Sequence, residues 1–235
     1  MRYAIYFAPG PTDPLTREAA AWLGRDAFTG AVLPHPQTST LPRETIVGIT
    51  ASARRYGFHA TLKAPFRLAP GYGEADLVAA FEHFVAANEG FTIPEMIVGN
   101  LSGFFAIVPR EPSSALNAFA GRVVTSFEKF RAPLTQAEIA RRNPEQLSLS
   151  EAANLQEWGY PYVFDSFRFH MTLTDRIPAE DRPAIEAQLQ RLFAPVLPKP
   201  FPIQNLGLFV EPEPGAPFHV LRHAPLLAAS DRKTA

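Results

Sequence analysis

The chain contains the string Tyr-Gly-Phe-His-Ala-Thr-Leu-Lys at residues 56–63 and the string Phe-Arg-Phe-His-Met-Thr-Leu-Thr at residues 167–174. Both contain Phe-His-x-Thr-Leu, and the two histidines, His59 and His170, lie 111 residues apart (170 − 59). Apolar and polar residues alternate in each string, which predicts a β-strand with one buried face and one polar face. Each strand then presents an imidazole and a hydroxyl together on its polar face.

The segments that follow the two motifs have the same order of expected elements. In each case an amphipathic helix comes first and a hairpin second, which defines repeat units at residues 58–109 and 167–223. The expected helices cover residues 74–88 and 179–193, and the expected hairpins cover residues 91–109 and 201–223. We therefore expect one domain of two similar lobes at residues 1–228, because the length suits one large domain better than two independent ones.

The remaining segments extend this mixture of helices and strands. Residues 30–52 are rich in Pro, Thr and Ser, which predicts a long loop with one short helix. Residues 135–158 are expected to be helical and carry two adjacent arginines, Arg141 and Arg142. Residues 229–235 are expected to form a disordered tail. The other expected elements are a strand at residues 2–8 and helices at residues 15–25 and 113–130.

Composition excludes several classes of protein. The chain has 235 residues, a formal net charge of −1 and no cysteine. The charge argues against a long nucleic acid as partner, and the lack of cysteine excludes disulfides, thiolate metal sites and cysteine nucleophiles. No run of 18 apolar residues is present, so no membrane partner is expected. The apolar run at the N-terminus is too short for a signal peptide, so we expect a cytoplasmic location.

The paired motifs predict acid–base chemistry on phosphate. Two imidazoles near neutral pKa can act as general base and general acid in one step. The hydroxyls of Thr61 and Thr172 can donate to the non-bridging oxygens of a phosphate. By strict alternation Lys63 shares the face of His59, and Arg168 shares that of His170, so either cation can offset the developing negative charge.

Two residues before the first motif are further candidates for substrate contacts. Arg55 can bind a second phosphate, or its side chain is simply solvated. Tyr56 can stack on a base or sugar, or cover the edge of the sheet. Of Tyr3 and Tyr6, which differ in parity on their strand, one is expected to line the cleft.

A metal or cofactor is not expected. The other histidines do not have metal-ligand spacing, and acidic residues are not clustered beside them. The chain has no Gly-rich phosphate loop and no Gly-x-Ser-x-Gly elbow.

The paired His-x-Thr motifs resemble those of the 2H phosphoesterase superfamily. The longer string Tyr-Gly-Phe-His-Ala-Thr-Leu-Lys-Ala-Pro-Phe at residues 56–66 also resembles a bacterial subgroup encoded near phosphonate-degradation genes. The resemblance implies an α+β, LigT-like fold: two lobes related by a pseudo-two-fold, with duplicated antiparallel sheets flanked by helices around a central cleft. It implies a catalytic tetrad of His59, Thr61, His170 and Thr172. Residues 131–160 then look like a helical insertion.

The resemblance also implies a metal-independent cyclic phosphodiesterase. Within the phosphonate subgroup the expected substrate is a phosphoribosyl cyclic phosphate, and the partner in general is a small phosphorylated sugar or nucleotide. Two alternatives stay open: a module that binds a nucleotide or phosphorylated sugar without turnover, and an enzyme that processes RNA 2′,3′-cyclic phosphate or 2′,5′ ends. The sequence does not decide which histidine is the base, nor the oligomeric state.

Overall fold

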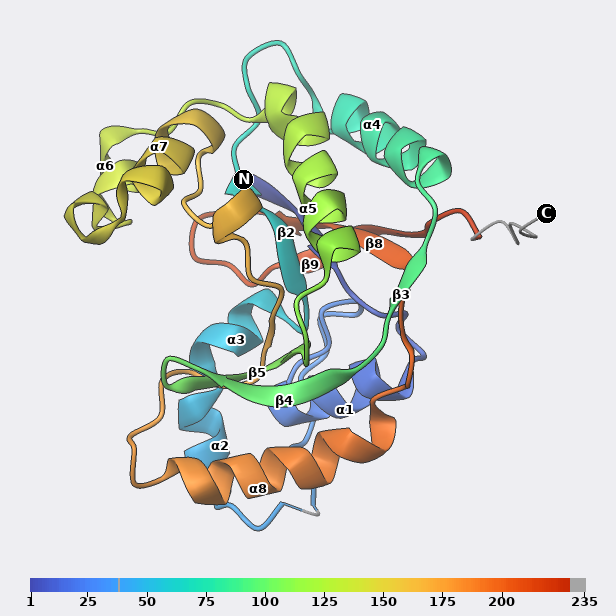
Figure 1. Cartoon of the computed structure of the whole chain (residues 1–235), viewed down its shortest axis with the longest axis vertical. Coiled ribbons are helices and arrows are strands. Elements are labelled where there is room, and N and C mark those ends of the chain that lie inside the picture. The colour runs from blue at the N-terminus through green and yellow to red at the C-terminus, as the bar shows by residue number, and fades with distance from the viewer. Residues whose placement is uncertain (38, 229–235) are drawn as a thin grey trace.

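A computed structural model of the chain describes residues 1–37 and 39–228. The expected tail at residues 229–235 lies outside the described residues. Within them, strands and helices form two halves, one above the other in Figure 1, that share a single curved sheet. The α+β class with antiparallel strands flanked by helices is confirmed.

The main sheet joins the two halves of the molecule. In the described part of the chain it has seven strands in the order β4-β5-β6-β2-β1-β8-β9, and all neighbouring pairs are antiparallel. Its strands are β1 (Arg2–Phe7), β2 (Ala60–Phe66), β4 (Met96–Leu101), β5 (Phe104–Pro109), β6 (Met171–Thr172), β8 (Asn205–Glu211) and β9 (His219–Pro225). A small antiparallel pair, β3 (Phe91–Ile93) and β7 (Phe201–Ile203), lies beside it.

Helices cover each half of the sheet. Helices α4 (Glu74–Ala87) and α5 (Ser114–Phe127) pack on the half that contains β2, β8 and β9, whereas α1 (Pro14–Leu23) and α8 (Arg182–Phe193) pack beside β4 (Figure 1). The short helices are α2 (Arg43–Ile49), α3 (Ala51–Tyr56), α6 (Gln136–Ala140), α7 (Leu149–Trp158) and the 3₁₀ turns Glu128–Phe130, Pro144–Gln146, Phe164–Ser166 and Ala194–Val196.

The two repeat units exchange their hairpins across the sheet. The β4–β5 hairpin of the first unit pairs with β6 of the second, and the β8–β9 hairpin of the second unit joins β2 of the first through β1. Helix α4 of the first unit likewise contacts β8 and β9, and α8 of the second contacts β4. The halves are therefore intertwined, and the antiparallel pairing of β2 with β6 lies where they meet.

Alternation along β1 explains why the sheet has two different faces. Tyr3, Ile5 and Phe7 belong to the large apolar core, while Tyr6 belongs to a smaller cluster that includes Phe209 and Phe218. Successive side chains of a strand point to opposite faces, so one strand supplies both layers. The smaller cluster forms an aromatic layer on the face that carries His59.

Several expected elements are shorter or divided in the structure. The expected strand at residues 167–174 is regular only at Met171–Thr172, and the apolar run at 91–98 divides into β3 and β4 around Pro94. The short helix expected within the loop at 30–52 is α2, whereas the sequence pattern did not indicate α3, which follows it directly. Proline lacks a backbone donor, which explains the break at Pro94.

Candidate active site

The two His-x-Thr motifs meet on adjacent antiparallel strands. Ala60 of β2 pairs with Met171 of β6, and both side chains are fully buried. Continuing this register by one residue sets His59 opposite Thr172 and Thr61 opposite His170. These four side chains lie on the opposite face from Ala60 and Met171, and all four are partly exposed. The face predicted to carry the tetrad is therefore formed, with each imidazole across from the other motif's hydroxyl.

Hydrogen bonds hold His59 in one orientation. Its Nδ1 lies 2.8 Å from the carbonyl oxygen of Gly57, and its Nε2 lies 3.2 Å from Oγ1 of Thr61. A carbonyl oxygen can only accept, so Nδ1 carries the proton and Nε2 keeps its lone pair. Gly57 ends α3 with a φ of +79°, and a Cβ there would lie 2.4 Å from Cβ of Ala27. Only glycine can present this carbonyl here.

His170 is held in the same way. Its Nδ1 lies 2.7 Å from the carbonyl oxygen of Arg168, which is two residues earlier in the chain. Gly57 stands in the same position relative to His59. The ring of Phe104 contacts its imidazole edge-on, with 5.8 Å between ring centroids. Both histidines therefore keep an unprotonated Nε2, which is the atom needed to accept or relay a proton in the cleft.

An aromatic layer supports His59. The Tyr6 ring stacks on the imidazole with 3.8 Å between centroids, and Phe209 lies behind Tyr6 at 4.9 Å. Tyr56 lies 6.0 Å from the imidazole and stacks on Phe218. Of the two candidate tyrosines, Tyr6 is thus the one beside the site, while Tyr3 is buried in the main core and donates to Glu74.

The environment lowers the pKa of both imidazoles. Burial lowers the pKa of His59 to about 4; the hydrogen bond that Nδ1 donates to the Gly57 carbonyl oxygen opposes this shift, and the charge of a protonated His170 adds to it. Burial also lowers the pKa of His170. Both side chains are therefore neutral at neutral pH without a bound anion. A phosphate between them would favour their charged forms and raise both pKa values.

The prediction that Lys63 shares the cleft face with His59 is wrong. The β1–β2 register shifts between Tyr6↔Thr61 and Ile5↔Lys63, so an extra residue interrupts the alternation of β2. Cross-strand partners share a face, so Lys63 points with Ile5 toward the main core. It is 3% exposed, and its Nζ lies 2.7 Å from a Glu128 carboxylate oxygen and 3.1 Å from the Val124 carbonyl oxygen.

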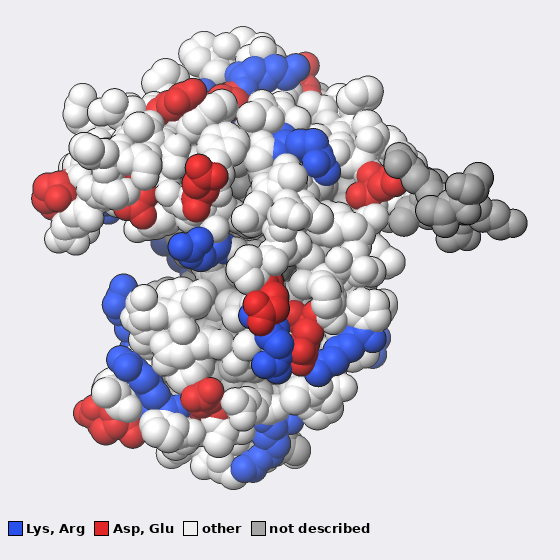
Figure 2. Space-filling model, in the orientation of Figure 1, with Lys and Arg blue, Asp and Glu red and all other residues white. Residues whose placement is uncertain are grey.

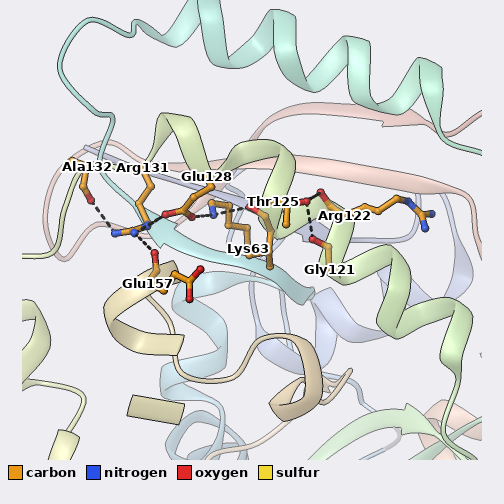
Figure 3. A network of polar contacts seen from close by, with 9 residues as sticks. Lys63, Gly121, Arg122, Thr125, Glu128, Arg131, Ala132 and Glu157 are labelled. Carbon is orange, nitrogen blue, oxygen red and sulfur yellow. Dashed lines mark hydrogen bonds and ion pairs between the residues drawn. The ribbon is translucent and has the colours of Figure 1, made fainter. Parts of the chain in front are cut away.

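Glu128 connects the first motif strand to the helical segment at residues 131–160. Besides Lys63 it accepts from Nε of Arg131 at 2.8 Å, and Nη2 of Arg131 donates to the carbonyl oxygen of Glu157 at 2.9 Å (Figure 3). Glu157 belongs to α7, so this chain of contacts fixes α7 relative to β2. The lysine that the sequence suggested as a phosphate contact is instead part of this structural network.

The other candidate contacts have different surroundings. Arg168 is exposed on the side of His170, and no carboxylate pairs with it among the described residues. Arg55 forms an ion pair with Glu211 and lies over the ring of Tyr56. Tyr56 is half-buried between Phe218 and the site. Glu211 was not identified from the sequence as the partner of Arg55, and this residue is fully buried. Its position directly after Phe209-Val210, at the end of an apolar strand, is a signal that could have identified it.

The surface is hollowed between the half that carries α6 and α7 and the half that carries α1 and α8, and basic side chains border this hollow (Figure 2). Among the described residues, no three His, Asp or Glu side chains gather as a metal site would require. None of the described helices has the length and apolar character needed to cross a membrane.

Fold and site together define an α+β protein in which two antiparallel His-x-Thr strands meet on one face of a shared sheet. The family described as "Protein of unknown function (DUF1045)" matches residues 61–219, which is more than half of the chain. The chain belongs to this family.

Two curated bacterial relatives match almost the whole chain. Both carry the name ribose 1,5-bisphosphate phosphokinase PhnN: one from Janthinobacterium sp. (strain Marseille) is 38% identical over 235 residues, and one from Laribacter hongkongensis (strain HLHK9) is 36% identical over 231 residues. The alignments cover 98% and 97% of this chain but 52% and 53% of the relatives. This chain thus spans about half of their length.

Solved structures with a related course of the chain include Escherichia coli LigT. The complex with 3′-AMP is 14% identical, covers 96% of this chain and 97% of that one, and has a TM-score of 0.43. The complex with NADP⁺ is 16% identical, covers 96% of each chain and has a TM-score of 0.42. These likenesses are too weak to assign a ligand or an activity to this chain.

Proposed function

We propose that this protein is a metal-independent phosphoesterase of the 2H type, which opens a small cyclic phosphodiester by general acid–base catalysis. One observation carries the proposal: His59 and His170 directly precede the adjacent antiparallel strands β2 and β6, each with Nδ1 hydrogen-bonded to the carbonyl two residues earlier. Two imidazoles with free Nε2 atoms on one face suit a reaction that takes one proton and gives another.

The step that these residues would perform is in-line hydrolysis. Nε2 of one histidine takes a proton from water, and the water oxygen forms a bond to phosphorus. The P–O bond to the leaving oxygen breaks, and the other histidine gives its proton to that oxygen. Thr61 and Thr172 donate hydrogen bonds to the non-bridging oxygens, which gain negative charge in the transition state. The product is a ring-opened phosphate monoester.

We assign the base to His59 and the acid to His170. The pKa of His59 is lowered to about 4, so its Nε2 is unprotonated over a wide pH range. The hydroxyl oxygen of Thr61 lies 3.2 Å from that Nε2. In the reaction an attacking water would take the place of this hydroxyl as the hydrogen-bond partner of Nε2. His170 then takes the role of the acid, because a phosphate anion bound between the histidines favours the protonated imidazole that an acid requires.

The substrate we propose is a phosphoribosyl cyclic phosphate. The names of the curated relatives contain ribose 1,5-bisphosphate, and hydrolysis of a 5-phosphoribosyl 1,2-cyclic phosphate at the O2 bond would yield that compound. The kinase activity in those names is not proposed for this chain, which has no Gly-x-x-x-x-Gly-Lys-Ser/Thr phosphate loop. A cytoplasmic location accords with such a substrate and belongs to the same proposal.

The test is a hydrolysis assay with 5-phosphoribosyl 1,2-cyclic phosphate beside 2′,3′-cyclic nucleotides, with phosphorus NMR to identify the product. We expect turnover of the first compound and a monoester product. Turnover of cyclic nucleotides alone would overturn the substrate, and failure of every cyclic phosphate in the panel would overturn the phosphoesterase activity and favour a binding module.

A further inference from the structure

A polar cavity with a volume of about 490 Å³ borders the histidine site at Tyr56. It is enclosed by the end of α3, the start of β1, the end of β2, the β8–β9 loop and the helical segment at 131–160. Five arginines line it, together with a single carboxylate, Glu138. These arginines are Arg2, Arg55, Arg67, Arg141 and Arg142.

The charges around this cavity do not balance. Arg67 is held by Glu138, with Nη2 3.1 Å from a carboxylate oxygen. Arg2 and Arg55 share the buried Glu211, whose pKa burial would raise but whose two arginine partners hold below its usual value. Five guanidinium groups therefore face two carboxylates, an excess of three positive charges (5 − 2).

The excess charge is located on the helical segment. Within the described part of the chain, the Arg141 guanidinium donates only to the carbonyl oxygen of Ala137, and the Arg142 guanidinium lies 5.0 Å from the centre of the Tyr160 ring. Neither has a carboxylate partner among the described residues. Guanidinium groups without carboxylate partners at a cavity are suited to bidentate hydrogen bonds with a phosphate.

The cavity adjoins the acid–base site. Tyr56 lines the cavity, and its ring centre is 6.0 Å from that of His59. A molecule of sugar-phosphate size that lies along Tyr56 can thus reach the histidines with one end and the arginines with the other. The network of Glu128 and Arg131 holds the helical segment against β2 and so maintains this arrangement.

We propose that this cavity binds a second, non-reacting phosphate group of the substrate, with Arg141 and Arg142 as its principal ligands. The inference rests on the proposed function, because it assigns the cavity to the substrate of the histidine site. It gives the 5-phosphate of the proposed substrate a binding site, so the preferred substrate is a cyclic phosphodiester that also carries a phosphate monoester. A phosphate monoester is nearly doubly charged at neutral pH and matches the excess of positive charge.

The first experiment measures binding without turnover. Ribose 5-phosphate is titrated by calorimetry into the wild-type chain, the double variant R141A/R142A and the control R17A/R191A. Arg17 and Arg191 are exposed on α1 and α8, so the control removes the same charge elsewhere. We expect the cavity variant alone to bind at least about tenfold more weakly, since hydrogen bonds to charged groups contribute on that scale. Equal affinities, or no binding to the wild type, would overturn the proposal.

The second experiment compares 2′,3′-cyclic AMP with and without a 5′-phosphate. R141A/R142A should lower kcat/KM for the 5′-phosphorylated compound at least about tenfold, mainly through a higher KM. For the compound without a 5′-phosphate, kcat/KM should change less than about threefold. R141K/R142K should recover part of the loss, because lysine keeps the positive charge but cannot form the bidentate hydrogen bonds of a guanidinium group. Equal effects on both compounds would contradict the assignment. If neither these compounds nor 5-phosphoribosyl 1,2-cyclic phosphate is cleaved but ribose 5-phosphate binding differs as expected, the cavity assignment stands and the proposed activity fails.

Discussion

Nζ of Lys63 lies 2.7 Å from the carboxylate of Glu128, on the side of β2 that faces the main core. The first motif thus presents His59 and Thr61 on one face and a buried ion pair on the other. Glu128 also binds Arg131, so the same carboxylate secures the helical segment that borders the arginine-lined cavity. Lys63, which the sequence suggested as a phosphate ligand, thus stabilises β2 from the side of the main core.

Replacing Lys63 should therefore affect stability more than chemistry. Lys63→Met leaves Glu128 with Arg131 alone, and we expect the free energy of unfolding to fall by about 1–3 kcal/mol, the usual cost of a lost charged hydrogen bond. Lys199→Met is a matched control, because Lys199 pairs with Glu95 at the exposed surface, where such pairs contribute about 0–1 kcal/mol. Denaturant unfolding and kcat/KM would be measured together. A large loss of kcat at unchanged stability would show that Lys63 contacts the substrate.

The two histidines should be separately essential. His59→Ala and His170→Ala are each expected to lower kcat by about 100-fold or more, because each removes one proton-transfer group. His83→Ala serves as control, since His83 is exposed on α4 away from the site. Steady-state assays at saturating substrate measure the effect. Near wild-type kcat in either site variant would exclude the acid–base pair.

The lowered pKa of His59 links folding to pH. Between about pH 4 and 6.5 the unfolded chain binds a proton at His59 that the folded chain does not, so the free energy of unfolding rises with pH in this window. This contribution is complete above the unfolded pKa and is lost as pH falls toward 4. We expect His59→Gln to lose less stability than the wild type between pH 6.5 and 4, as denaturant unfolding at a series of pH values would measure. With His83→Gln as reference, identical pH slopes in all three proteins would argue against a depressed pKa.

The ring of Tyr6 should orient His59. Tyr6→Phe keeps the stacked ring and is expected to retain kcat within about threefold, whereas Tyr6→Leu should lower it by about two- to tenfold, in line with the energy of an aromatic pair. The rates are compared at saturating substrate and far below the unfolding temperature of each variant. Equal losses in both variants would point to the hydroxyl group rather than to stacking.

Activity should survive removal of divalent ions. The chemistry proposed for the two imidazoles needs no metal, so kcat after prolonged dialysis against EDTA should match that of the untreated protein. Loss of activity on dialysis, restored by adding one metal ion, would require a different mechanism.

Alternation along the sequence was sufficient to place His59 and Thr61 on one polar face of the first motif. Phe58, Ala60 and Leu62 are buried while His59 and Thr61 are partly exposed, as the period of two predicts. Alternation fails at Lys63, because the bulge between β1 and β2 depends on a partner strand more than 50 residues earlier in the chain. For the same reason the pattern could not indicate that Tyr6 stacks on His59 or that Glu211 holds two arginines.

The sequence by itself therefore determined the α+β class, the two motif strands and the polar face of each, because these depend on local periodicity. Only the tertiary structure decided how the units combine: hairpins exchange across one sheet, Lys63 turns into the core and Arg141 and Arg142 border a cavity beside the site. These features arise from pairing and packing between residues far apart in the chain, which no local pattern encodes. The opposition of His59 to Thr172 and of Thr61 to His170 is likewise a property of the β2–β6 register.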